Sequence, residues 1–231
     1  MELIDSFHQA FSLLLSGDDE LWQTIFISLR VSLLALLLAT PFAVALGFFL
    51  ATTNFFGRRI IVVVLQSLLS FPTVVVGLIL YLLLTRSGPL GAFNLLFTQD
   101  AMILGQAVIA FPVLAAFTLA AVQATDQRVR ETAMSLGASR WRAMLTTLRE
   151  VRFALMAGVF NGFGRVISEV GCAMMVGGNI AGVTRNITTA ITLETGKGDF
   201  AQGIALGAVL MLLAVTVNIA LAFVQGKGTP K

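Results

Sequence analysis

Residues that ionise or react are scarce in this sequence. It contains one histidine and one cysteine, His8 and Cys172, and 12% of its 231 residues are charged, against roughly 25% in an ordinary soluble domain. A single cysteine excludes an intrachain disulfide, and we interpret Cys172 as a small packing residue. An enzyme gathers nucleophile, base or metal ligands in one place, and this composition leaves few candidates. We therefore expect no catalytic residues, no metal and no cofactor.

Two kinds of binding site are also missing. No Gly-Lys-Ser/Thr phosphate loop occurs, and the stretch from Gly196 to Asp199 does not supply one. The net charge of +3 is small, and the basic residues are not gathered into a nucleic-acid footprint. The sequence therefore predicts neither a nucleotide site of its own nor a nucleic-acid partner.

Long apolar runs take up most of the chain, and 57% of its residues are apolar. Four runs without a charge each exceed the roughly 20 residues that cross a bilayer as a helix: residues 31–57, 60–85, 101–125 and 200–226. A fifth run, 153–184, is interrupted only by Arg165 and Glu169. All are far longer than the roughly ten-residue strands of a membrane barrel. We predict an all-α membrane protein with five transmembrane helices, forming one transmembrane domain over residues 1–231.

The first 20 residues precede these runs and have a different character. Acidic residues such as Glu2 and Asp5 stand where a cleaved signal peptide has a basic stretch. Apolar residues from Leu3 to Leu15 have helical spacing, with polar residues between them. We predict that residues 1–20 form an amphipathic segment outside the membrane, either lying in the interface or packed on the bundle as an extension.

Basic residues are unevenly divided between the loops. With five spans, the two chain ends lie on opposite sides of the membrane. If the N-terminus is outside, ten basic residues are inside: Arg58, Arg59, Arg128, Arg130, Arg140, Arg142, Arg149, Arg152, Lys227 and Lys231. The outer segments then contain Arg86, Arg185 and Lys197, with most of the acids. Because basic loops stay in the cytoplasm, we predict the N-terminus outside and the C-terminus inside.

The longest inner loop, residues 123–152, has an amphipathic pattern of its own. Apolar residues recur there at the three- and four-residue intervals of a helix: Ala133, Met134, Leu136, Trp141, Met144, Leu145 and Leu148. Gly137 divides the pattern, and glycine adopts backbone angles that bend or end a helix. We predict a short helix, a bend, and a second helix with Arg140 and Arg142 on its polar face. Because isolated short helices are marginal in water, the pair should dock, either on lipid headgroups or on a soluble partner.

Three residues of this loop resemble a family motif. Glu131, Ala133 and Gly137 are spaced as in the "EAA…G" loop of the permeases of binding-protein-dependent ABC importers, and the loop lies between the third and fourth predicted spans. Thr132 replaces the usual second alanine, and the family's downstream Leu-Pro pair is absent. Pro72 and Pro112, each after a phenylalanine, are similar to prolines in two helices of the same family.

This resemblance implies a type I ABC importer permease fold with residues 123–152 as a cytoplasmic coupling loop. In that family the coupling helix fits into a cleft of a cytoplasmic ATPase subunit, which hydrolyses the ATP. The coupling residues that it implies here are Glu131, Ala133, Leu136, Gly137, Arg140 and Trp141.

The second informative stretch surrounds the two charges of the fourth run. Ionisable groups inside a span are costly and commonly functional. Arg165 and Glu169 are four residues apart, so on a helix they share a face and can pair. They either line an anion path or form an ion pair that fixes helix packing. Glycines interrupt the end of the run, and Asn179, Thr184 and Thr188 stand nearby; interrupted helices expose amides that favour anions. These five residues are our candidates for the translocation pathway.

Residues 168–191 contain the runs Ser-Glu-Val-Gly, Val-Gly-Gly-Asn-Ile, Thr-Arg and Thr-Thr-Ala-Ile. They resemble the tungstate/molybdate branch of the same importer family, and most closely its tungstate-specific permeases, and the likeness covers nearly the whole chain. The resemblance implies a homodimer in the bacterial or archaeal inner membrane, in contact with lipid, with two ATPase subunits and an extracytoplasmic substrate-binding protein. The implied function is ATP-driven import of an oxyanion, with tungstate first and molybdate next. The alternative is a secondary transporter or channel that uses an ion gradient, with Glu169 as its proton-linked group.

Overall fold

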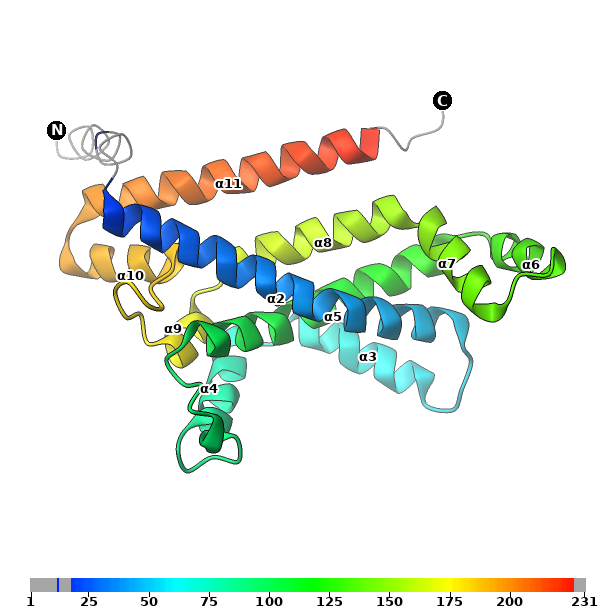
Figure 1. Ribbon diagram of the computed structural model, residues 1–231, viewed down its shortest axis with the longest axis horizontal. Coiled ribbons are helices and arrows are strands. Elements are labelled where there is room, and N and C mark those ends of the chain that lie inside the picture. The colour runs from blue at the N-terminus through cyan, green and yellow to red at the C-terminus, as the bar shows by residue number, and fades with distance from the viewer. Residues whose placement is uncertain (1–11, 13–17, 227–231) are drawn as a thin grey trace.

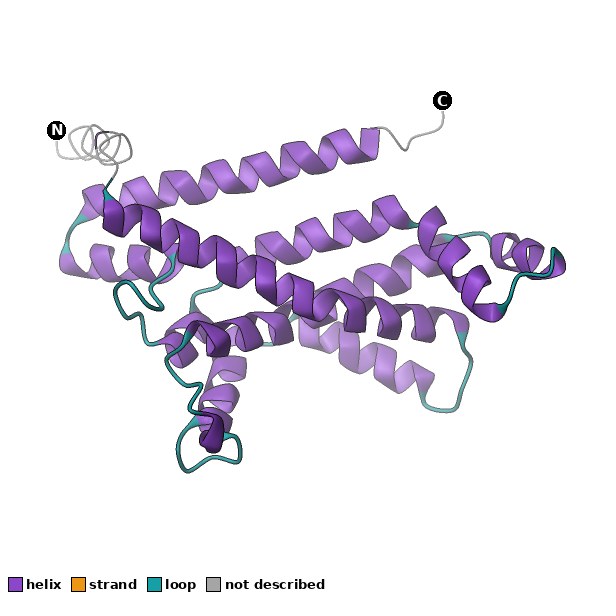
Figure 2. Ribbon diagram, in the orientation of Figure 1, coloured by secondary structure: helices purple, strands orange, loops and turns teal. Residues whose placement is uncertain are grey.

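The computed structural model of the protein describes residue 12 and residues 18–226. Within them every regular element is helical (Figure 2). The elements in chain order are α2 (Asp19–Thr52), α3 (Arg58–Leu69), α4 (Thr73–Leu84), the short 3-10 helix η1 (Gly91–Phe93), α5 (Gln99–Ala124), α6 (Gln127–Ser135), α7 (Arg140–Glu150), α8 (Arg152–Ile167), α9 (Gly171–Gly177), α10 (Ile187–Lys197) and α11 (Phe200–Gly226). Most of the predicted amphipathic segment 1–20, including His8, lies outside the described residues.

The centre of the bundle is the contact between α2 and α5. Helix α2 presents Ala35, Ala39, Ala43 and Gly47 at four-residue intervals, and all four are buried. Small residues at this spacing form a flat stripe that lets two helix backbones approach closely. A Cβ atom on Gly47 would lie 2.6 Å from the carbonyl oxygen of Ala115 in α5. Helix α8 completes the core, since its Phe163, Val166 and Ile167 pack into the same cluster.

The predicted second span is broken in the middle. Residues 60–85 form two helices, α3 and α4, whose axes differ by 101° across Ser70, Phe71 and Pro72. Proline has no amide hydrogen and disfavours helical angles in the residue before it, so the break falls at the expected residue. Its angle is much larger than a simple kink, and α4 projects from the side of the bundle (Figure 1).

The fourth run is also not the continuous helix that the sequence predicted. Helix α8 ends at Ile167, Ser168 to Val170 are non-helical, and the short helix α9 follows. The backbone carbonyl of Glu169 accepts a hydrogen bond from the Thr188 hydroxyl at 2.7 Å instead of one from a following helical turn. A contact 19 residues further along the chain therefore stabilises this break.

Three described helices are long and apolar enough to cross a membrane, namely α2, α5 and the part of α11 from Phe200 to Phe223. The bent pair of α3 and α4 gives a fourth if it is counted as one span. Helix α8 has 16 residues, fewer than the roughly 20 of an upright span. Five spans therefore remain a prediction.

The bundle has two different ends. The turn between α2 and α3 lies at the same end as the helix pair α6 and α7 (Figure 1), and Arg58 and Arg59 directly follow this turn as the first residues of α3. The start of α2 and helix α10 lie at the opposite end. The loops that the sequence predicted to be cytoplasmic are thus together in space, although the orientation in a membrane remains a prediction.

Candidate functional site

The loop of residues 123–152 folds as the sequence predicted, into two short helices separated by a bend at Gly137. Asp126 begins α6 by accepting a hydrogen bond from the Arg128 amide at 2.9 Å, and Ser139 begins α7 by accepting one from the Arg142 amide at 3.3 Å. Gly137 has a φ of +84°, which glycine adopts without strain. Each helix start and the bend thus have a local cause in the sequence.

The helix pair leaves several large apolar side chains uncovered. Met144 and Leu148 pack against Phe48 and Val122 of the bundle. In contrast, Leu136 is 83% exposed and Trp141 is 64% exposed, and Met134 and Leu145 are also exposed. Clustered apolar side chains on a polar, charged surface mark a docking site. The pair therefore has one face that holds it to the bundle and another that is available to a partner.

The six predicted coupling residues are divided among three places. Ala133, Leu136 and Gly137 line one open groove of about 670 Å³ between α6 and α7. Glu131 instead lines a polar pocket of about 430 Å³ with Arg58 and Arg130, facing the turn between α2 and α3. Arg140 and Trp141 are exposed on α7 and line neither cavity. Glu131 is thus placed to link the helix pair to α3, which sequence reasoning did not anticipate.

The predicted pairing of Arg165 with Glu169 is confirmed. The distance from Arg165 Nη1 to Glu169 Oε2 is 3.1 Å, even though helix α8 ends between the two residues. The partners differ in burial, since the side chain of Arg165 is 38% exposed and that of Glu169 only 2%. A buried carboxylate without a partner is strongly destabilising, so the contact with Arg165 stabilises Glu169 in this buried position.

Glu169 is the centre of a junction between three segments. Its Oε1 atom accepts a hydrogen bond from the Cys172 amide at 3.1 Å, at the start of α9. Its backbone carbonyl accepts one from Thr188 Oγ1, which also lies 2.9 Å from Asn186 Oδ1. The structure thus brings Arg165, Glu169 and Thr188 together, which are three of the five predicted pathway residues.

Asn179 and Thr184 belong to a neighbouring turn. Thr184 is fully buried, and its hydroxyl donates to the Gly177 carbonyl at 2.5 Å and accepts from the Ile180 amide at 3.0 Å. Asn179 donates to the Thr189 carbonyl at 3.4 Å, and its Oδ1 atom is buried without a partner. The hydroxyl of Thr184 is thus engaged by the turn, which leaves Asn179 with the one unpaired polar atom of this group.

Two structurally important residues were missed by sequence reasoning. Asn186 caps α10, because its side chain accepts from the Thr189 amide at 2.9 Å while the Thr189 hydroxyl accepts from the Asn186 amide at 3.1 Å. The order Asn-x-x-Thr could have shown this capping box. Ser28 of α2 accepts from the Ile187 amide at 2.7 Å, and no local signal could have paired residues so distant in the chain.

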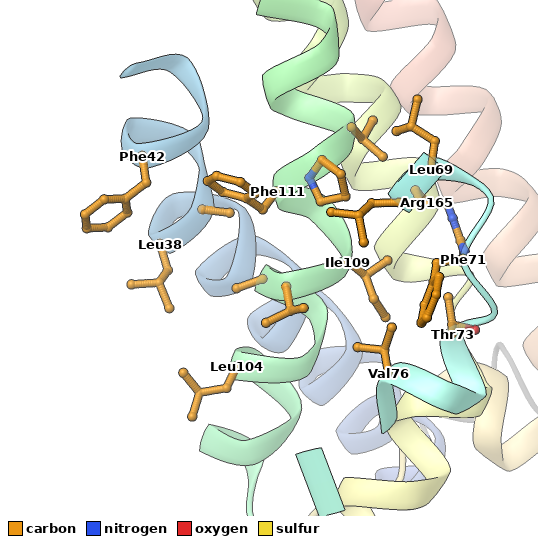
Figure 3. Close-up of a pocket in the computed structure, with 16 residues that line it drawn as sticks. Leu38, Phe42, Leu69, Phe71, Thr73, Val76, Leu104, Ile109, Phe111 and Arg165 are labelled. Carbon is orange, nitrogen blue, oxygen red and sulfur yellow. The ribbon is translucent and has the colours of Figure 1, made fainter. Parts of the chain in front are cut away.

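A cavity of about 430 Å³ lies beside Arg165, between α2, α5 and the break of α3 and α4 (Figure 3). Its walls are apolar, with Phe71 and Thr73 on either side of Pro72 and with Phe111 and Pro112 on α5. Arg165 is the one charged side chain among the described residues that line it. An apolar wall strengthens the field of a nearby charge, so an anion that enters this cavity is attracted to Arg165.

The chain is similar to several known proteins. The family described as "binding-protein-dependent transport system inner membrane component" matches residues 43–227. A probable anion ABC transporter permease protein of Haloferax volcanii is 42% identical over 200 residues, which cover 84% of this chain and 84% of that protein. The tungstate uptake system permease protein TupB of Campylobacter jejuni is 44% identical over 216 residues, which cover 94% of this chain and 90% of that protein.

A solved structure shares the fold. A chain of a bacterial ABC transporter involved in the import of the acidic polysaccharide alginate matches with a TM-score of 0.71, over 96% of this chain and 82% of that chain. The sequence identity is 19%, so this likeness bears on the arrangement of helices alone. It supports the permease fold that the loop motif implied.

Proposed function

The chain belongs to the family of binding-protein-dependent transport system inner membrane components, and from this premise we propose that it is the permease subunit of an ATP-driven importer of an oxyanion. Among oxyanions, tungstate is the proposed substrate and molybdate is the second candidate. The observation that carries the proposal is the 44% identity to a tungstate uptake permease over 94% of this chain. Tungstate is a tetrahedral dianion, and an arginine is the side chain that suits its recognition.

The proposed topology has five spans with the N-terminus outside. The broken pairs α3–α4 and α8–α9 each count as one span, since interrupted helices occur in transporters where they line a cavity. The end of the bundle with Arg58, Arg59, α6 and α7 then faces the cytoplasm, in agreement with the positive-inside rule.

Ser135 is exposed on α6, so a Ser135→Cys variant should react with a membrane-impermeant thiol reagent in inside-out vesicles and not in intact cells. Reaction in intact cells would reverse the topology.

The partners are those that the family implies, and the exposed surfaces offer places for them. The pair α6–α7 docks on a cytoplasmic ATPase subunit through the groove of Ala133, Leu136 and Gly137 and the exposed Trp141, with Glu131 and Arg140 at its margins. A substrate-binding protein delivers the oxyanion from outside. Helix α11 exposes much of its apolar surface, including Met211, Leu212 and Phe223, which is available to lipid and to a second copy of the chain. The whole chain acts as one permease domain, and hydrolysis of ATP belongs to the partner.

The proposed pathway passes the junction of Arg165, Glu169 and Thr188 and the turn that holds Asn179 and Thr184.

Uptake of isotope-labelled tungstate tests the proposed import function in vesicles that contain the chain with its ATPase and binding protein. We expect uptake of the labelled tungstate. Unlabelled tungstate should inhibit it at a lower concentration than unlabelled molybdate. Equal accumulation in vesicles without this chain would contradict the proposal.

A further inference from the structure

The ion pair of Arg165 and Glu169 is asymmetric in a way that a packing contact does not require. Glu169 is almost completely buried, whereas more than a third of the Arg165 side chain is exposed. A guanidinium has five N–H donors, and the ion pair is the one hydrogen bond that the Arg165 side chain makes to a described residue. Most of its N–H donors therefore have no partner among the described residues.

Open space lies on both sides of α8. Arg165 lines the apolar cavity of about 430 Å³ near Phe71 (Figure 3) and a second cavity of about 320 Å³ between α8 and α11. The second cavity also contains Asn161 and Asn218, whose amide groups donate to carbonyls of their own helices at 2.8 Å. In each cavity Arg165 is the one charged residue among the described lining residues. An anion in either cavity therefore has this guanidinium as its ionic partner.

The carboxylate of Glu169 already occupies one side of the Arg165 guanidinium. The Cys172 amide donates to its Oε1 atom, and Thr188 donates to the backbone carbonyl of Glu169. A carboxylate and a tetrahedral oxyanion present similar oxygen atoms to a guanidinium. Glu169 is thus a permanently tethered anion at the position where a transported anion would bind.

The consequence for affinity follows from the charges. An unpaired arginine beside apolar walls would bind a dianion tightly and release it slowly. Conduction requires a contact strong enough to admit the ion and weak enough to let it leave. Glu169 neutralises Arg165 and repels a second anion. It thereby lowers the affinity of the site for the dianion, so that the ion can both enter and leave.

The consequence for the backbone follows from burial. When an oxyanion binds Arg165 in place of Glu169, Glu169 becomes a buried carboxylate without its cation, which is an unfavourable state. The side chain of Glu169 is only 2% exposed, so its carboxylate gains solvation only if the chain around it moves, and Ser168 to Val170 are the non-helical residues there. Occupation of Arg165 is thus coupled to opening of the joint between α8 and α9.

We propose that Glu169 is a tethered competitor of the transported oxyanion for Arg165, so that each passing anion exchanges with this carboxylate. Arg165 touches the substrate, and Glu169 acts through Arg165 as a positioning residue that weakens the contact. This inference rests on the proposed function, because it needs an oxyanion as the substrate.

Glu169→Gln tests the exchange. Glutamine retains an oxygen that can accept from the Cys172 amide but removes the competing charge. We expect the binding affinity for isotope-labelled tungstate, measured on the permease–ATPase complex in lipid nanodiscs without the binding protein, to rise by about tenfold or more. Because release becomes slow, uptake in vesicles should fall by about tenfold. An affinity equal to or below that of the wild-type complex would overturn the proposal.

The double variant R165Q/E169Q separates this role from a structural one. It leaves no buried charge unpaired, so we expect a thermal midpoint close to that of the wild type. If the pair served only packing, uptake would be preserved; we expect it to fall to background, and wild-type uptake by the double variant would overturn the proposal even if E169Q failed to fold. Failure of the wild-type complex to import tungstate would instead count against the proposed function itself.

Discussion

Replacing Gly137 with proline is expected to abolish ATP-driven oxyanion uptake while leaving the chain inserted in the membrane. Gly137 has a φ of +84°, and its amide donates to the Met134 carbonyl at 3.0 Å. Proline fixes φ near −65° and has no amide hydrogen, and a misplaced proline costs about 3 kcal/mol or more. Two short helices have little stability of their own, so α6 and α7 should lose their arrangement. Uptake in vesicles and the amount of chain in membranes measure the two effects separately.

Gly137→Ala is the matched control for this variant. A Cβ atom at Gly137 would meet no atom within 4 Å, so alanine adds only the strain of a left-handed backbone, roughly 1–2 kcal/mol. We expect intermediate uptake.

Glu131→Arg should also abolish uptake, because it adds a third cation to the pocket of Arg58 and Arg130. Normal uptake in both Gly137→Pro and Glu131→Arg would refute the coupling role of this loop.

Gly47→Ala is expected to destabilise the whole bundle. The added Cβ would lie 2.6 Å from the Ala115 carbonyl oxygen and 2.6 Å from Thr118 Cβ in α5. A backbone oxygen cannot turn aside as a side chain can, so α2 and α5 must separate. Overpacking of this kind costs about 1–3 kcal/mol. We expect a lower thermal midpoint in detergent and less monodisperse protein.

Gly164→Ala provides the comparison, since it makes the same chemical change in another helix of the bundle. Gly164 lies in α8 and a Cβ there would meet no atom within 4 Å. Alanine favours a helix over glycine by about 1 kcal/mol, so the midpoint should stay the same or rise. If Gly47→Ala were as stable as Gly164→Ala, the close contact of α2 with α5 would be wrong.

Features with a local cause were predictable from the sequence. The bend at Gly137 follows from the backbone freedom of one residue, and the break near Pro72 follows from a missing amide. The spacing of Arg165 and Glu169 predicted their pairing because four residues make about one helical turn. In each case the cause lies within a few residues of the effect.

Features that depend on distant contacts were not predictable. The end of α8 at Ile167 is stabilised by Thr188, and Ser28 of α2 adds a distant contact to the local Asn186 cap at the start of α10. The exposure of Leu136 and Trp141 was also hidden, because the helical pattern did not distinguish a face on the bundle from a face toward a partner. The apolar composition of residues 60–85 gave no measure of the 101° angle between α3 and α4.

The energy source of transport tests the central claim most directly. Vesicles containing this chain, its ATPase and the binding protein would be loaded with ATP or with a non-hydrolysable analogue, with and without ionophores that collapse the proton and sodium gradients. We predict tungstate uptake with ATP, none with the analogue, and no effect of the ionophores. Uptake that persists with the analogue and stops with the ionophores would show a gradient-driven carrier and contradict the assignment as an ATP-coupled permease.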